Sequence, residues 1–254
     1  MSTEIAKNLP NLRLLENLSD GQKRFLFGFV NLNIYKMELS WDLDQTLEIT
    51  EDSVKAFTDA ENGTNYFDRR IDGWNSIANW LVEDKIMGKE KAWAYEHRLW
   101  TNNDILMMGP PNIKLRDLSF AANQREIPQS VTTVRVCGLR QTTYRWLDEH
   151  YPWIAKGNIN FRIGMNPTGF EYKISKILTM YKSNPNLIHI DDDLKIIKVL
   201  VEKAPGLGIV GILCPNDDVS DIKYADNRVF LSRDDLNSLI YYAPLAKDMV
   251  AQHH

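Results

Sequence analysis

The chain has 254 residues, of which 44% are hydrophobic and 25% are charged, as in an ordinary soluble globular protein. The length fits one large domain, or a core domain with a smaller insertion. The net charge of −4 gives no electrostatic reason for tight binding along a nucleic-acid backbone, and the two cysteines form neither a disulfide framework nor a zinc site.

The N-terminal region is expected to be a helical extension over residues 1–35, in which Leu12, Leu15 and Leu18 make core contacts. Its first residues, MSTEIAKNLP, contain no apolar signal segment. No apolar run in the chain approaches the roughly 20 residues of a membrane span. We therefore expect a cytoplasmic protein without a membrane partner.

The first apolar strand is predicted at Lys36 to Leu43, and the stretch 49–128 that follows is rich in helix formers. This stretch contains no clear strand, so we interpret it as an inserted helical cap between core segments 1–48 and 129–254. Pro110-Pro111 marks a turn inside it. Tyr66, Trp74 and Trp80 are aromatic residues of the cap that could stack on a nucleobase, although aromatic residues at helical spacing more often form a subdomain core.

The remaining chain alternates apolar strands with helical patterns. The later strands are predicted at 131–138, 160–165, 187–191, 209–214 and 228–232. The helices are predicted at 142–151, 171–182 and 194–203, and a last one begins at Ser232. Most strands are nearly continuous apolar runs, which is typical of strands buried on both faces. The sequence therefore predicts an α/β fold with a Rossmann-like parallel sheet and helices on both faces.

Two acidic residues, Asp42 and Asp44, lie one residue apart at the predicted carboxyl end of the first strand. In open α/β sheets this end lines the crevice where ligands bind. The two carboxylates would repel each other unless a cation lies between them, and magnesium prefers such oxygen ligands. These two residues alone leave open a plain strand end in which Asp44 caps a helix.

A second acidic group, Asp191, Asp192 and Asp193, ends the apolar run Leu187 to Ile190. An apolar strand rarely ends in three consecutive acids unless a positive group binds there. The alternative is a solvated helix N-terminus, where acidic residues suit the helix dipole. The two acidic groups together favour a cation site.

These motifs carry a resemblance to a known family. The segment Asp42-Leu43-Asp44-Gln45-Thr46 resembles the DxDxT signature of the haloacid dehalogenase superfamily, and Ile190-Asp191-Asp192 is similar to its acidic fourth motif. The resemblance covers roughly residues 36–48 and 130–240, and the insertion matches the superfamily's cap position. The acidic pair and the helical cap resemble the deoxyribonucleotidase-like branch.

The resemblance implies a magnesium-dependent phosphatase that forms an aspartyl phosphate on Asp42. Asp44 would protonate the leaving oxygen and then activate the hydrolytic water. The resemblance also implies that the magnesium ion is held by Asp42, the backbone carbonyl of Asp44, and Asp192, with Asp191 close by. The substrate would be a small phosphorylated molecule, with a nucleoside monophosphate as the leading candidate.

The resemblance also implies which residues bind the phosphate. Lys173 has the family's spacing to the acidic fourth motif, and Lys176 is the alternative. The family's second motif ends a strand with Ser or Thr, whereas Cys137 occupies the aligned position here, and a thiol is a poorer donor than a hydroxyl. The further expected substrate-binding residues are Thr46, Gly138 and Arg140.

Two other functions are kept open. One is a phosphatase that trims polynucleotide ends during repair, which the acidic net charge disfavours. The other is a phosphate-binding regulatory protein on a catalytically weak scaffold, which the departure at Cys137 suggests. The substrate, the pathway and a homodimeric state are left undecided by the sequence.

Overall fold

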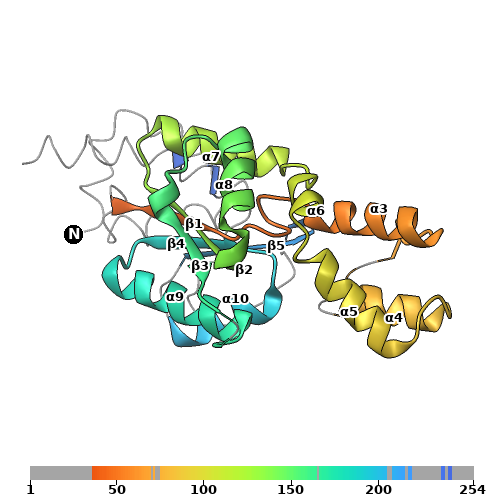
Figure 1. Ribbon diagram of the computed structural model, residues 1–254. Helices are drawn as coiled ribbons and strands as arrows, with labels where there is room; N and C mark the ends of the chain where they lie inside the picture. Colours follow the sequence, from red (N-terminus) through yellow and green to blue (C-terminus); the bar gives the residue numbers. More distant parts are fainter. Residues whose placement is uncertain are drawn as a thin grey trace, which may run out of the picture.

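The computed structural model describes residues 36–69, 71, 75–164, 166–204, 208–214, 217–218, 236–237 and 240–241 (Figure 1). The predicted N-terminal extension, the predicted strand at 228–232, the cap of the last helix at Ser232, and Trp74 lie outside these residues. Among the described helices, none has both the length and the apolarity needed to cross a bilayer.

A six-stranded sheet forms the centre of the molecule, in the order β3-β2-β1-β4-β5-β6. Strands β1 to β5 run parallel, and β6 pairs antiparallel with β5. The strands span Glu38–Trp41 (β1), Gln129–Val136 (β2), Ile159–Arg162 (β3), Leu187–Asp191 (β4), Gly208–Cys214 (β5) and Asp217–Asp218 (β6). This arrangement confirms the predicted α/β class with a parallel sheet.

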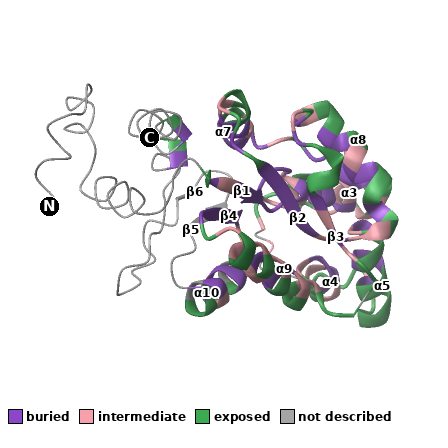
Figure 2. Ribbon diagram, turned by 90° about the vertical axis from the view of Figure 1, so that its left-hand side faces the viewer, coloured by how far each residue is buried: buried purple, intermediate pink, exposed green. Residues whose placement is uncertain are grey.

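Helices cover both faces of the sheet (Figure 1). On one face, α7 (Ile113–Gln124) and α8 (Arg140–His150) share an apolar cluster with β1, and on the other, α9 (Gly169–Ser183) and α10 (Leu194–Lys203) pack together with Leu187 of β4. Short 3-10 helices, Cys137–Leu139 and Lys156–Asn158, precede α8 and β3. Every residue of β4 is buried, as the nearly continuous apolar run predicts (Figure 2).

Local signals in the sequence fix where two of these helices begin. Thr168 and Glu171 form a reciprocal capping box at the start of α9. Asp193 caps α10, because its carboxylate accepts from the backbone N–H groups of Lys195 and Ile196. Asp193 therefore serves as a helix cap, while its two acidic neighbours face the site described below.

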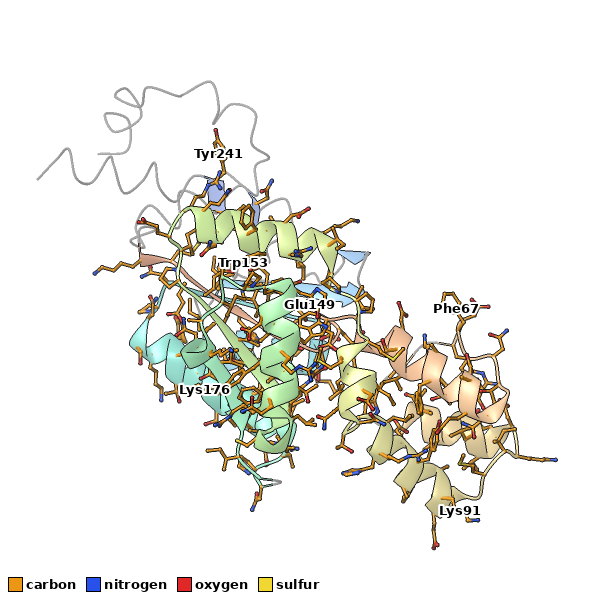
Figure 3. The ribbon with its side chains drawn as sticks, turned by 45° about the horizontal axis from the view of Figure 1, so that its top comes forward. Phe67, Lys91, Glu149, Trp153, Lys176 and Tyr241 are labelled. Atoms are coloured by element: carbon orange, nitrogen blue, oxygen red, sulfur yellow. The ribbon has the colours of Figure 1, made fainter. Side chains whose placement is uncertain are left out.

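The segment 49–128 is helical, and its helices belong to two different apolar clusters. The helices are α3 (Thr50–Asn62), α4 (Ser76–Glu83), α5 (Lys89–Leu99), α6 (Asn103–Met107) and α7. A cluster that includes Val54, Ile77, Leu81 and Leu99 joins the first helices into a body beside the sheet, where Phe67 and Lys91 are found (Figure 3). Leu115 and Leu118 of α7 instead lie in the cluster of the sheet.

The chain enters and leaves the inserted helices side by side. The N–H of Ile49 donates to the carbonyl of Pro110, and the N–H of Asn112 donates to the carbonyl of Leu47, both at 2.8 Å. Pro111 also forms a bridge with Glu48. We call residues 47–49 together with 109–112 the hinge.

Candidate active site

The candidate site lies at the carboxyl ends of the two central strands. Asp42 directly follows β1, Asp191 ends β4, and the backbone N–H of Asp42 donates to the carbonyl of Ile190 at 2.8 Å. The chain leaves β1 for β2 on one side, whereas β4 lies on the other, so the strand order reverses here. Such a reversal is where open α/β sheets bind ligands.

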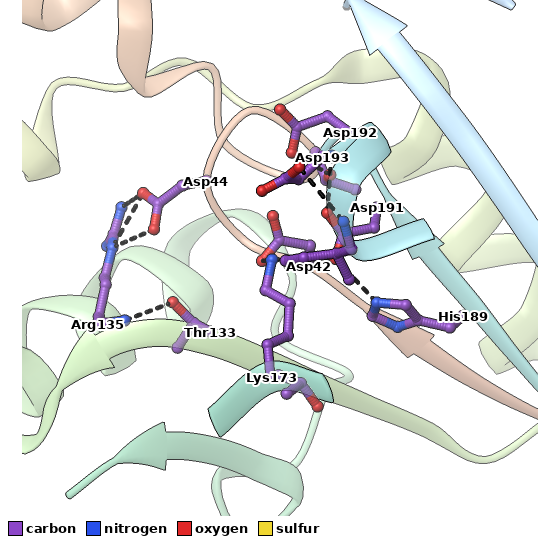
Figure 4. A network of polar contacts seen from close by, with 12 residues as sticks. Asp42, Asp44, Thr133, Arg135, Lys173, His189, Asp191, Asp192 and Asp193 are labelled. Atoms are coloured by element: carbon purple, nitrogen blue, oxygen red, sulfur yellow. Dashed lines mark hydrogen bonds and ion pairs between the residues drawn. The ribbon is translucent and has the colours of Figure 1, made fainter. Parts of the chain in front are cut away.

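Three carboxylates converge at this point (Figure 4). One oxygen from each of Asp42, Asp191 and Asp192 lies within 4.8 Å of the others. Asp42 is 3% exposed and Asp191 is fully buried. The structure therefore brings Asp42 of the first motif together with Asp191 and Asp192 of the second, although the two motifs are far apart in the chain.

Lys173 of α9 lies against two of these acids. Its Nζ atom is 2.8 Å from Oδ1 of Asp42 and 3.0 Å from Oδ2 of Asp191, and its side chain is buried. Lys176, the alternative from the sequence, is half-buried one turn further along α9 (Figure 3). Of the two lysines, Lys173 is the one placed at the carboxylates.

Burial and crowding shift the charges of these groups. Burial raises the pKa of Asp42 to about 7, with Lys173 opposing the shift and Asp191 adding to it. Burial also raises the pKa of Asp192 well above its usual range. Burial likewise acts to raise the pKa of Asp191, but Lys173 and His189 outweigh it and hold that pKa at about 2. The charge of Lys173 alone therefore does not stabilise all three aspartates in their ionised form.

His189 contacts the carboxylate of Asp191 within β4. Its Nε2 atom is 2.9 Å from Oδ2 of Asp191, and its Nδ1 atom is 3.1 Å from the backbone carbonyl of Ser40. His189 is fully buried in β4. The sequence gives no signal for this role, because His189 has no metal-ligand spacing to another histidine and its contact is with a carboxylate two residues away.

The side chain of Asp44 faces away from the three-acid group. Its carboxylate accepts hydrogen bonds from Nε of Arg135 at 3.1 Å and from the hydroxyl of Thr50 at 2.9 Å (Figure 4). Burial acts to raise the pKa of Asp44, but the charge of Arg135 outweighs it, so the pKa lies below its usual range. The predicted participation of Asp44 in ion binding through its backbone carbonyl stays a prediction.

The other predicted substrate-binding residues lie at two places. The hydroxyl of Thr46 donates to Oδ1 of Asp192 at 3.4 Å, so it contacts the acidic cluster. Arg140 donates to Sγ of Cys137 at 3.5 Å and lies over the ring of Phe161 on the edge strand β3. Cys137, with Gly138 in the same 3-10 helix, packs against the apolar core. The substrate roles of these four residues stay predictions.

Comparison with known proteins rests on structure. No family model matches the chain, and no curated protein matches its sequence. Solved structures do match. One is a HAD family hydrolase from Deinococcus radiodurans with bound phosphate and sodium, with a TM-score of 0.52 at 15% identity. The match covers 83% of this chain and 98% of the Deinococcus chain. A candidate phosphoglycolate phosphatase from Lactobacillus delbrueckii has a TM-score of 0.50 at 12% identity, covering 81% and 98%.

A subfamily IA HAD hydrolase from Entamoeba histolytica matches with a TM-score of 0.49 at 18% identity, covering 81% of this chain and 99% of its own. The two structures with TM-scores of 0.52 and 0.50 show that the chain has the haloacid dehalogenase fold. The sequence resemblance to that superfamily is thereby confirmed at the level of the fold, whereas the deoxyribonucleotidase-like branch stays a hypothesis.

Within this haloacid dehalogenase fold, the sequence missed two polar residues of β2, Thr133 and Arg135. Thr133 is fully buried, its hydroxyl accepts from the N–H of Arg135 at 3.1 Å, and the pairing of β2 with β3 becomes irregular after it. Thr133 thus places a hydroxyl in the polar network of Figure 4. The sequence offers no clear signal for either residue, because β2, QSVTTVRV, also contains Gln129, Ser130 and Thr132.

Proposed function

We propose that the chain is a magnesium-dependent phosphomonoesterase that acts through an aspartyl phosphate on Asp42. The observation that supports the proposal most directly is the convergence of Asp42, Asp191 and Asp192 within 4.8 Å, with Nζ of Lys173 at 2.8 Å from Asp42. A buried carboxylate beside a lysine and two further acids suits a nucleophile that must approach a phosphate dianion.

The donor set fits magnesium. All three converging groups are carboxylates, and hard divalent cations take oxygen ligands of this kind. The raised pKa values of Asp42 and Asp192 reflect burial and like-charge crowding, which a bound cation would relieve. When bound by these acids, magnesium supplies positive charge that reduces the repulsion between the nucleophile and the phosphate.

In the proposed mechanism, a carboxylate oxygen of Asp42 attacks phosphorus, and the bond from phosphorus to the ester oxygen breaks. Asp44 gives a proton to the leaving alkoxide or phenoxide oxygen, and it does so from its protonated form, which the ion pair with Arg135 disfavours by lowering the pKa. A water molecule then attacks the phosphorus of the aspartyl phosphate, Asp44 takes its proton, and inorganic phosphate leaves with the Asp42 carboxylate restored. Lys173 orients Asp42 and stabilises negative charge on the transferring group.

The proposed substrate class is a small phosphorylated metabolite, with nucleoside monophosphates as one candidate group. The phosphate bound in the Deinococcus structure agrees with the class. The aromatic cap residues give the nucleotide little support, because Tyr66 is 2% exposed and packs against Trp80 in a tilted arrangement, with ring centroids 5.3 Å apart, inside the insertion's own cluster. The Tyr66–Trp80 pair is therefore better explained as packing than as a base platform.

The test is phosphate release from a panel of nucleotides, sugar phosphates and a 3'-phosphorylated oligonucleotide, with magnesium and with a chelator. We expect release that requires magnesium and that falls at least 1,000-fold in Asp42→Asn, because the covalent step is lost. Asp148→Asn, an exposed acid paired with Lys156, is the matched control and should retain activity. Release that survives Asp42→Asn would overturn the mechanism.

A preference for the oligonucleotide would favour the repair function. Binding of magnesium and phosphate without turnover would favour the regulatory function.

A further inference from the structure

We propose that Glu48 positions the carboxylate of Asp44 by binding Arg135, the arginine that binds Asp44. Through this contact, Glu48 connects Asp44 with the hinge of the inserted segment. The inference rests on the proposed function, in which Asp44 transfers the proton. It concerns the part of the site that faces away from the three-acid cluster.

The guanidinium of Arg135 joins Asp44 to Glu48. Its Nη2 atom donates to Oδ1 of Asp44 at 2.5 Å and to Oε2 of Glu48 at 2.7 Å, while Nε also donates to Asp44. Its Nη1 atom donates to the hydroxyl of Thr143 at 3.3 Å. All three guanidinium nitrogens are therefore engaged, and the planar group has little freedom to rotate.

Glu48 is enclosed by the hinge. It is fully buried, and within the described part of the chain its Oε1 atom has no hydrogen-bond partner. A Cβ atom built on Gly109 would lie 2.4 Å from that Oε1 atom. The backbone of residue 109 thus lies against the carboxyl group of Glu48. Only glycine fits at position 109 without displacing that carboxyl group.

The backbone of Glu48 also connects the hinge with the motif loop. Its N–H donates to the carbonyl of Leu43 at 2.9 Å, and its carbonyl accepts from the N–H of Gln45 at 2.7 Å. On its other side it bridges to Pro111. Glu48 therefore contacts the loop that carries Asp42 and Asp44, the side chain of Arg135, and the second hinge segment, residues 109–112.

Asp44 must meet the leaving oxygen at a defined angle, and Arg135 sets the direction of its carboxylate. Without the acceptor at Glu48, one bond of Nη2 is lost and the guanidinium is free to reorient towards Asp44 alone. The proton donor is then misplaced while Asp42, Lys173 and the ion site stay intact. The expected defect is in protonation of the leaving group.

The experiment compares two probes whose leaving groups differ in their need for a proton. The alkoxide of glycerol 2-phosphate needs protonation, whereas the p-nitrophenolate of p-nitrophenyl phosphate leaves without it. We expect Glu48→Leu to lower kcat/KM at least tenfold for glycerol 2-phosphate and less than threefold for p-nitrophenyl phosphate. Glu48→Gln, which keeps the shape and an acceptor oxygen, should stay within threefold of wild type for both probes.

Equal losses for the two probes in Glu48→Leu would overturn the proposal, because general damage to the fold lowers both rates alike. A loss as large in Glu48→Gln as in Glu48→Leu would also overturn it. If Glu48→Leu does not fold, Gly109→Ala replaces it, since the added methyl group pushes on the same carboxyl, and the same selective loss is expected.

The failure of this proposal can be distinguished from failure of the proposed function. If the wild-type chain hydrolyses neither probe, the proposed function fails, and the hinge contact is then measured by amide hydrogen exchange. The N–H groups of Ile49 and Asn112, which bond across the hinge, should exchange at least tenfold faster in Glu48→Leu than in Glu48→Gln. Equal exchange in the two variants would overturn the link to the hinge.

Discussion

Replacement of Lys173 by methionine tests the electrostatic balance of the acidic cluster. Methionine keeps most of the volume of the lysine stem but removes the charge that contacts Asp42 at 2.8 Å and Asp191 at 3.0 Å. Both carboxylates are buried, so neither gains water in compensation. The variant therefore leaves negative charge uncompensated in the interior.

The expected loss is large. Removing one partner of a buried ion pair costs about 3–5 kcal/mol. For a chain of this size, about 1 kcal/mol changes the melting temperature by roughly 2–4 °C, which gives a fall of about 6–20 °C in the absence of metal. Magnesium should reduce the difference between variant and wild type, because the cation replaces the missing positive charge at the same carboxylates.

The assay is thermal unfolding of wild type, Lys173→Met and Lys176→Met, each in a chelator and in magnesium. Lys176 is the control because it lies one turn along the same helix and is half-buried. Its replacement should change the melting temperature by only a few degrees.

Two results would refute the reasoning about Lys173. One is a melting temperature for Lys173→Met within a few degrees of Lys176→Met in the chelator. The other is a gap between wild type and Lys173→Met that magnesium leaves unchanged.

Three further predictions concern residues around the site. Trp146→Phe should lower the free energy of unfolding by about 1–3 kcal/mol in urea denaturation, because the carbonyl of Gly109 loses the indole donor at 2.7 Å. Thr133→Val should reduce kcat for phosphate release more than Cys137→Ala does, because the Thr133 hydroxyl belongs to the polar network of the site; equal effects would count against this assignment. Burial raises the pKa of Glu48 to about 8, so the wild type loses stability as pH rises from about 5 to 8, by at most about 1.4 kcal/mol per pH unit. Glu48→Gln lacks this titration, and its melting temperature should improve relative to wild type over that range.

The sequence predicted the strands well where burial alone determines them. Leu187 to Ile190 is an apolar run interrupted only by His189, and β4 has the predicted bounds, Leu187–Asp191. The first strand was predicted too long, because Asp42 and Leu43 already belong to the turn that presents the acids. Short apolar runs give no signal for the residue at which strand pairing stops.

The candidate site was predictable only where chemistry and position coincide in the sequence. Asp42 and Asp192 each directly follow a strand, β1 and β4, so their convergence follows from a parallel sheet. Arg135 is 91 residues from Asp44 in the chain, and its contact depends on strand register and on the irregular end of β2. No local pattern encodes a pairing of that kind.

The packing of α7 was also beyond a local pattern. Its apolar residues, among them Leu115, fit a helix in either an insertion or a core. Only the three-dimensional arrangement shows that they belong to the cluster of the sheet.

The two hydrogen bonds that join Leu47 to Asn112 and Ile49 to Pro110 have an evolutionary consequence. Both ends of the inserted helices meet at one junction, so a gene segment of almost any length can be exchanged there without altering how the strands are connected. Under the proposed phosphatase function, new selectivity for the leaving group can arise by exchange of the inserted helices, while Asp42 and Asp44 are retained.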